Sequence, residues 1–259
     1  METNVKFDFH GKNFVVVGAS SGMGRQIALE LAEAGAGVLA IARNQERLEK
    51  LQQEYPELIT TAQIDVMSAK TEDWKGCLSD FAKAHGKISG GVYTAGINKP
   101  TPLQMYSEET ARAIFETSFW GMVHFLQAAT RIRVAEKGSS YVVFSSLAAH
   151  CGNRGGFAYS CAKASVQMAA RVFAREIVRD GHRINSISPG WVKTPLTADE
   201  ALANERMEAA FNSPLCLGMG NPEDVSGTVL FLLSNRGKWF TGSDILVDGG
   251  ALYSGDIGG

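Results

Sequence analysis

NFVVVGASSGMG, residues 13–24, joins a short apolar run to a glycine-rich turn. The run predicts a buried strand, and the stretch after the turn carries apolar residues at helical spacing. Glycine suits such a junction: Gly18 permits a sharp turn, Gly22 lets the backbone approach a pyrophosphate, and Gly24 lets helix and strand pack closely. The free N–H groups and the positive dipole end at the start of the helix favour phosphate. The spacing GxxxGxG differs from the usual GxGxxG, so the turn alone is a weak signal, and its place in the first strand–helix unit strengthens it.

Strand-like and helix-like stretches alternate along the rest of the chain. Strands separated by helices need crossover connections, so the sheet should be mostly parallel. Continuously apolar runs such as YVVF, residues 141–144, fit a sheet covered on both faces. We therefore predict an α/β fold of the Rossmann type, with a doubly wound, mostly parallel seven-stranded sheet and helices on both faces. The predicted strands are 13–18, 37–42, 59–66, 88–94, 141–145, 183–187 and 244–247, and the predicted helices are 22–34, 45–55, 72–84, 111–136, 159–179 and 222–234.

The whole chain, residues 1–259, is predicted to be a single nucleotide-binding domain. Its length fits one large α/β domain or two small ones, and the sequence shows no linker, internal repeat or low-complexity segment. The polar stretch 194–212 resembles an insertion over the sheet edge, so we expect a substrate loop near 191–217.

Composition argues against several classes of protein. The formal net charge of −2 leaves no basic surplus for nucleic acid, and no apolar run approaches the length of a membrane span. The N-terminus lacks the pattern of a secretory signal. The scattered cysteines Cys77, Cys151, Cys161 and Cys216 suit free thiols better than a metal site. We expect a cytoplasmic protein with a small-molecule partner and no metal.

The end of the second predicted strand bears on the choice of nucleotide. An acidic residue there would bind the 2′-hydroxyl of NAD and repel a 2′-phosphate, and Ile41-Ala42-Arg43-Asn44 contains none. The guanidinium of Arg43 offers a fork of donors to phosphate instead, which favours NADP(H). A solvated loop arginine is the alternative. Asp65, after the third strand, could contact adenine or cap a helix.

Tyr159 and Lys163 stand four residues apart in a predicted helix and so share one face. An ammonium near a phenol favours the phenolate and lowers the phenol's pKa from about 10, which suits a general acid for ketone reduction. Ser146, just after the fifth strand, could hydrogen-bond the substrate oxygen. A Tyr-x-x-x-Lys pair is common by chance, so this prediction depends on its conjunction with the glycine-rich turn and the strand-end serines.

Together these motifs resemble the short-chain dehydrogenase/reductase family in its compact single-domain branch, close to 3-oxoacyl-(acyl carrier protein) reductases and hydroxysteroid dehydrogenases. The resemblance runs nearly end to end, in the family's order and spacing. Its motifs are GASSGMG at 18–24, Asp65-Val66, Ala95-Gly96, Ser145-Ser146, Tyr159-x-x-x-Lys163, NSISPG at 185–190, Thr241-Gly242 and VDGG at 247–250.

The resemblance implies a role for each matching residue. Tyr159 would exchange the substrate proton, Lys163 would assist it and bind the nicotinamide ribose, and Ser146 would orient the carbonyl during NADP(H)-dependent interconversion of a secondary alcohol and a ketone. A homotetramer or homodimer is expected, formed through the long helix and the helix of Tyr159. The implied cofactor contacts are Gly18, Ser20, Ser21, Gly22, Met23, Gly24, Arg43, Asp65, Val66, Ala95, Gly96, Tyr159, Lys163, Pro189, Gly190, Val192 and Thr194.

Two departures from the family pattern bear on catalysis. Tyr93-Thr94 stands where the family has Asn-Asn, and Ser118 takes the place of an asparagine that helps to hold a water chain behind the lysine. Ser118 is therefore a possible fourth catalytic residue, and a catalytically idle NADP(H)-binding sensor or scaffold is the alternative function. A nucleotide-sugar epimerase or dehydratase fits less well, because those relatives carry a longer C-terminal region. Substrate-pocket candidates are His150, Asn153, Phe157 and Trp191, for each of which ordinary packing is an equal alternative; aromatic residues there favour a hydrophobic or acyl-type substrate.

Overall fold

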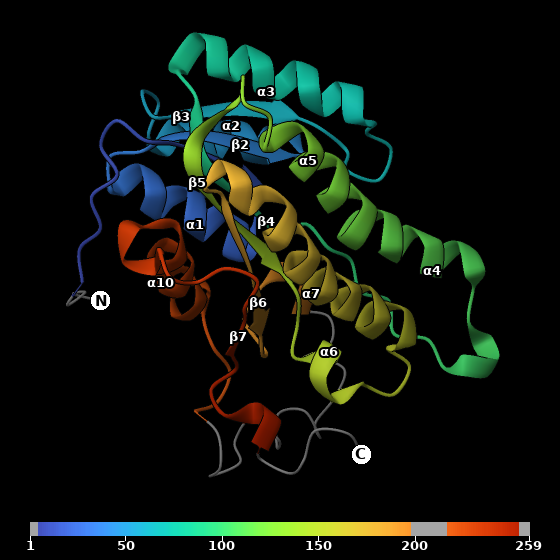
Figure 1. The fold of residues 1–259 in the computed structure, drawn as a ribbon. Helices are drawn as coiled ribbons and strands as arrows, with labels where there is room; N and C mark the ends of the chain where they lie inside the picture. Colours follow the sequence, from blue (N-terminus) through green and yellow to red (C-terminus); the bar gives the residue numbers. More distant parts are fainter. Residues whose placement is uncertain (1–4, 198–216, 254–259) are drawn as a thin grey trace.

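The computed structural model contains a seven-stranded sheet in the order β3-β2-β1-β4-β5-β6-β7 (Figure 1). It describes residues 5–197 and 217–253. Every strand pairing is parallel, which confirms the predicted doubly wound α/β sheet. Residues 198–216 of the predicted substrate loop lie outside the described residues. The strands are β1 Asn13–Val17, β2 Gly37–Ala42, β3 Ile59–Gln63, β4 Ile88–Tyr93, β5 Ala135–Phe144, β6 Arg183–Pro189 and β7 Asp244–Val247.

Helices cover both faces of the sheet, as predicted (Figure 1). One face packs against α1, α2 and α10, and the other against α3, α5 and α7. Within the described residues, no helix has both the length and the apolar character needed to cross a membrane. The helices are α1 Gly22–Glu33, α2 Gln45–Glu54, α3 Thr71–His85, α4 Glu108–Phe115, α5 Gly121–Ala129, α6 Ala148–Cys151, α7 Phe157–Ile177 and α10 Pro222–Leu233, with 3-10 turns at Leu103–Met105, Val178–Asp180, Asn235–Gly237 and Ala251–Tyr253.

The sequence of the central strand β1 is apolar without alternation because both faces of the strand are buried. Phe14 and Val16 point into the core beneath α1 and α10, whereas Val15 and Val17 point into the core beneath α3, α5 and α7. All four side chains are buried, so polar residues would be costly on either face. At about 1.5–3 kcal/mol for each fully buried aliphatic or aromatic side chain, this strand contributes strongly to the core.

The predicted long helix 111–136 is wrong in its extent. Helix α4 ends at Phe115, a π-helical turn spans Glu116–Trp120, and α5 ends at Ala129. The π turn faces β4, where the hydroxyl of Tyr93 donates to the carbonyl of Thr117 at 2.6 Å. The contact from β4, which helical periodicity does not reveal, thus accompanies the π turn between α4 and α5, and the helical stretch ends at Ala129 instead of 136.

Strand β5 also starts earlier than predicted, at Ala135 instead of 141. Its first half, AEKGSS, is polar and contains an irregularity in its pairing with β4 between Ile88 and Gly90. Ser139 compensates there, because its hydroxyl lies 3.0 Å from the carbonyl oxygen of Ile88 and 2.6 Å from that of Glu136. A polar side chain supports the strand locally, so no apolar pattern marks it.

Candidate active site

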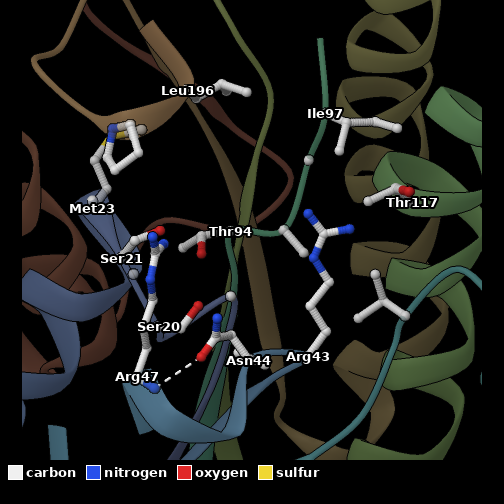
Figure 2. A pocket seen from close by; sticks show the side chains of 18 of the residues that line it. Ser20, Ser21, Met23, Arg43, Asn44, Arg47, Thr94, Ile97, Thr117 and Leu196 are labelled. Carbon is white, nitrogen blue, oxygen red and sulfur yellow. Dashed lines mark hydrogen bonds between the residues drawn. The ribbon is translucent and has the colours of Figure 1, made fainter. Parts of the chain in front are cut away.

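A cavity of about 420 Å³ lies at the carboxyl ends of β1, β2, β3 and β4 (Figure 2). The strand order reverses between β1 and β4, and doubly wound sheets bind ligands at such a point. Most of the predicted cofactor residues meet here. Those that line the cavity are Gly18, Ser20, Ser21, Gly22, Met23, Gly24, Arg43, Asp65, Val66, Ala95, Gly96 and Thr194.

The glycine-rich turn is packed too tightly for larger side chains. Gly18 has a φ of 88°, and a Cβ there would collide with Thr94. A Cβ on Gly24 would lie 2.6 Å from Thr94 Oγ1 and closer still to the carbonyl oxygen of Gly18. The backbone therefore runs bare along the cavity floor. No side chain caps the N-terminus of α1 at Ser21, so the start of this helix presents backbone donors to an anion.

Two arginines lie on the cavity rim, on either side of Asn44 (Figure 2). Asn44 caps α2 by accepting a hydrogen bond from the backbone N–H of Arg47 at 2.9 Å. Among the described residues, neither the Arg43 nor the Arg47 guanidinium has a hydrogen-bond or ion-pair partner, unlike Arg25, which pairs with Glu54. Arg47 was not predicted from the sequence, although its spacing of four residues from Arg43 was a usable signal.

Asp65 closes the turn after β3. Its Oδ1 accepts a hydrogen bond from the backbone N–H of Met67 at 3.0 Å, and its side chain lines the cavity. The N-terminus of α3 is instead closed by Asp73, which accepts from the backbone N–H of Lys70. Of the two roles considered for Asp65, the structure therefore excludes the capping of α3.

Ser146 and Tyr159 line a second, smaller cavity of about 60 Å³. Ser146 follows β5, and its Oγ accepts from the backbone N–H of Ala148 at 3.2 Å. Tyr159 lies in the first turn of α7, and Lys163 follows one turn later. The Lys163 Nζ lies 5.7 Å from the centre of the Tyr159 ring, so the fold brings all three predicted catalytic side chains together.

Lys163 is a buried cation with few partners. Its side chain is 3% exposed, and its Nζ donates to the carbonyl of Phe144 at 2.8 Å. Burial lowers the pKa of its ammonium to about 8. The neighbouring serine fixes the same helix turn, because the Ser145 hydroxyl donates to the carbonyl of Lys163 at 2.8 Å.

Ser118 lies close to the lysine. A Cβ placed on Gly96 would lie 3.2 Å from Lys163 Nζ and 3.6 Å from Ser118 Oγ, so both groups border the same space. The Ser118 hydroxyl is buried and has no hydrogen-bond partner within the described part of the chain. A buried hydroxyl without a partner marks a place for a water molecule or ligand.

The residues that replace the family's Asn-Asn hold the backbone. Tyr93 is fully buried, and burial raises the pKa of its phenol, so it stays protonated and donates to the π turn. The hydroxyl of Thr94 donates to the carbonyl of Val17 at 2.8 Å and joins β4 to β1 below the cavity. Both side chains therefore have structural partners of their own.

The remaining predicted residues lie at the end of β6 and beyond. Pro189 ends β6, and Gly190 lines the smaller cavity beside Trp191. Val192 is buried and forms a parallel bridge with Gly220, and it lines neither of these two cavities.

The substrate-pocket candidates separate into two groups. Asn153 and Trp191 line the smaller cavity, together with Thr197 from the predicted substrate loop and Asn98, which was not predicted. Phe157 packs edge-on against Tyr106 outside this cavity, and the ring of His150 hydrogen-bonds to Asp244.

No group of three His, Cys, Asp or Glu side chains in the described ranges is arranged to hold a metal ion.

Known proteins resemble this chain in sequence over nearly its whole length. A family model described as enoyl-(acyl carrier protein) reductase matches residues 18–252. The 3-oxoacyl-(acyl-carrier-protein) reductase FabG of Thermotoga maritima is 31% identical over 244 residues, which are 93% of this chain and 98% of that protein. A tropinone reductase homolog of Arabidopsis thaliana is 30% identical over 257 residues, 98% of this chain and 97% of its own.

Solved structures of short-chain dehydrogenases/reductases share the fold of this chain. The short-chain dehydrogenase/reductase glucose/ribitol dehydrogenase from Brucella melitensis superposes with a TM-score of 0.88 at 27% identity, covering 95% of this chain and 99% of its own. A short-chain type dehydrogenase/reductase from Mycobacterium ulcerans gives the same TM-score at 29% identity, with 95% and 91% coverage.

Proposed function

Because the chain belongs to the short-chain dehydrogenase/reductase family of oxidoreductases, we propose that it interconverts a ketone and a secondary alcohol with NADP(H). The observation that carries the proposal is the meeting of Ser146 and Tyr159 in one cavity, with the Lys163 ammonium beside the phenol. The nearby larger cavity, with its bare glycine backbone, fits a dinucleotide.

Each catalytic side chain has a distinct task in the proposed reduction. The Tyr159 phenol gives its proton to the substrate oxygen as the ketone becomes an alcohol, and takes it back in the reverse direction. The Ser146 hydroxyl hydrogen-bonds the same oxygen and holds it toward the phenol. The Lys163 ammonium stabilises the negative charge left on the tyrosine. When bound, the nicotinamide supplies or accepts the hydride.

Ser118 acts behind the lysine in this proposal. Its hydroxyl, which has no partner in the part of the chain that the structure describes, borders the space beside Lys163 Nζ and would hold a water that returns a proton toward the catalytic group. The shorter side chain leaves room for that water where the family has an amide.

NADP(H) is favoured by the guanidinium groups of Arg43 and Arg47 on the rim, neither of which has a partner among residues 5–197 and 217–253. A 2′-phosphate would satisfy both, and no carboxylate at the end of β2 would repel it. The test compares dissociation constants for NADPH and NADH. Arg43→Ala should weaken NADPH about tenfold or more, at about 1.5–3 kcal/mol for a charge-assisted bond, and leave NADH unchanged. Tighter binding of NADH by the unaltered protein would refute the assignment.

The substrate class rests on the relatives and the lining of the smaller cavity. Two matching relatives are named 3-oxoacyl-(acyl-carrier-protein) reductases, which supports an acyl-type or hydrophobic keto compound. Asn153 and Thr197 offer hydrogen bonds to a second polar group near the reacting carbonyl. NADPH oxidation against a panel of 3-oxoacyl thioesters, steroids and small diketones tests this. Turnover by the natural chain and its loss in Tyr159→Phe are expected, whereas nucleotide binding without hydride transfer to any ketone would favour the idle-sensor alternative.

Assembly and location complete the proposal. Trp120 next to α5 and Met168 and Val172 on α7 are exposed apolar side chains, which suits burial between copies in a homodimer or homotetramer. Light scattering tests the oligomer, and cell fractionation tests the predicted cytoplasmic location.

A further inference from the structure

A polar cluster lies between α6, α7, β6 and β7, next to the proposed catalytic residues. Its centre is Asp244, whose side chain is 6% exposed. One carboxylate oxygen, Oδ2, lies 2.9 Å from His150 Nε2 and 2.9 Å from Ser188 Oγ. Gln167 Nε2 donates to the same oxygen at 3.2 Å, and the Ser186 hydroxyl donates to Oδ1. We call these five residues the Asp244 cluster.

The cluster joins the two segments that carry the catalytic side chains. Gln167 follows Lys163 by four residues on α7, so the two lie on the same face of that helix. His150 follows Ser146 by four residues and belongs to α6, whose first backbone N–H donates to Ser146 Oγ. One carboxylate thus ties the Ser146 segment and the Tyr159 helix to the same pair of strands.

The cluster contains the residue types of a hydrolase triad but not its arrangement. Ser188 is fully buried and donates directly to the carboxylate, and no cavity described above reaches it. A nucleophile would need access to substrate and a base between it and the acid. The cluster therefore fits a structural task.

The hydrogen bonds of the Asp244 cluster explain how it connects α6 and α7 to the sheet. A buried carboxylate is costly unless donors satisfy it, and here side chains from β6, α6 and α7 converge on it. Because a carboxylate only accepts, the His150 Nε2–H is the donor in its contact with Asp244; the same ring nitrogen also lies 2.9 Å from Gln167 Nε2, so the three side chains meet at one point. The ring links α6 to the edge strand β7, so its loss would remove a side-chain tie between them, while the backbone N–H of Leu147 still donates to the carbonyl of Pro189 and α7 remains held by Gln167.

We propose that His150 is a positioning residue, which acts through Asp244 to hold Ser146 at a fixed place relative to Tyr159 and Lys163. The inference rests on the proposed function for the roles of those three residues. Misplacement of a catalytic group by about 1 Å can cost up to about 100-fold in rate.

The test compares His150→Ala, His150→Gln and the control His10→Ala, which removes a ring whose side chain is 82% exposed. In His150→Ala, we expect kcat to fall about tenfold while the dissociation constant for NADPH changes less than about twofold, because the larger cavity is untouched. The amide of His150→Gln can donate like Nε2–H, so kcat should return to within about threefold of the natural chain. Hydrogen exchange should accelerate at residues 147–152 and stay unchanged at 13–33.

Several results would overturn the proposal. Unchanged exchange at 147–152 in His150→Ala, or a kcat no lower than that of His10→Ala, removes the positioning role, as does a failure of glutamine to rescue. If His150→Ala does not fold, His150→Phe keeps a ring but removes the Nε2–H donor, and natural kcat with natural exchange at residues 147–152 in that variant contradicts the inference. If the natural chain turns over no ketone, the proposed function fails, and hydrogen exchange still decides whether His150 holds the segment.

Discussion

Replacing Lys163 by methionine should raise the free energy of unfolding of the nucleotide-free protein and abolish its activity. The Lys163 ammonium is buried, and its single hydrogen bond within the described residues goes to the carbonyl of Phe144. Burial lowers its pKa from 10.5 to about 8. At 1.36 kcal/mol for each tenfold change in proton affinity, the difference corresponds to a cost of about 3 kcal/mol below that pH.

The net effect is smaller than this cost. Methionine has a similar length and no charge, but it leaves the Phe144 carbonyl without its donor, a loss of about 1 kcal/mol. About 2 kcal/mol of stabilisation remains, which raises Tm by roughly 4–8 °C in a domain of this size. The sign of the pH dependence follows from the lowered pKa. The lysine penalty is complete below about pH 8 and fades as pH rises toward 10.5, where the amine is neutral in both states.

Calorimetry without nucleotide, at about pH 7 and about pH 9.5, measures this difference directly. The control is Lys87→Met, which removes an exposed lysine and should show no gap that closes with pH. NADPH oxidation checks the expected loss of activity. A Tm for Lys163→Met at or below that of the natural chain at neutral pH, or a gap that is the same at both pH values, would refute the reasoning.

Three other substitutions test separate parts of the site. Gly24→Ala places a methyl group 2.6 Å from Thr94 Oγ1 and closer to the Gly18 carbonyl, so denaturant titration should show a loss of about 1–3 kcal/mol, and nucleotide binding should weaken; normal binding and stability would contradict the tight packing. Ser118→Ala should change the free energy of unfolding by less than about 1 kcal/mol, because the hydroxyl has no partner among the described residues. It should lower kcat about tenfold by loss of the proposed water site. An unchanged kcat would remove Ser118 from the mechanism. Tyr93→Phe removes the buried donor to the Thr117 carbonyl and should cost about 1–3 kcal/mol in thermal unfolding, with faster hydrogen exchange in the π turn. Unaltered exchange there would contradict the support that Tyr93 gives to this turn.

The strands and helices could be predicted wherever burial leaves an apolar pattern in consecutive residues. The run in β1 is apolar because both of its faces are covered, and the alternation with helices sufficed for the parallel topology. Prediction from the apolar pattern was wrong in the segment 111–144, where contacts with residues distant in the sequence determine the ends of the helix and the strand. Apolar residues continue at helical spacing past the π turn, while Tyr93 from another strand contacts that turn, and serine hydroxyls support the polar start of β5.

The site shows the same division. The glycine-rich turn and the Tyr159–Lys163 pair are local patterns whose spacing carries their chemistry. Arg47 could have been found, because a helix beginning at 45 places it in the first turn, close to the end of the second strand where Arg43 lies. The Asp244 cluster could not, since its five residues come from four elements between 150 and 244 and share no motif. Of the two alternatives for His150, a place in the substrate pocket or ordinary packing, its hydrogen bond to Asp244 favours packing.

The two buried charges along α7 are bonded in opposite ways, and substitution should expose the contrast. Within the described residues Lys163 has one hydrogen bond, to the carbonyl of Phe144, so its burial is a cost. Asp244, near the next turn of the helix, is surrounded by four donating side chains, so its burial is compensated. Asp244→Asn keeps the shape but turns an NH₂ group toward donors, and should lower stability by about 1–3 kcal/mol, whereas Lys163→Met should raise it. Paired unfolding titrations of the two variants measure both signs. Stabilisation by Asp244→Asn would show that the carboxylate is strained instead of satisfied, and would remove the basis for its role in holding Ser146.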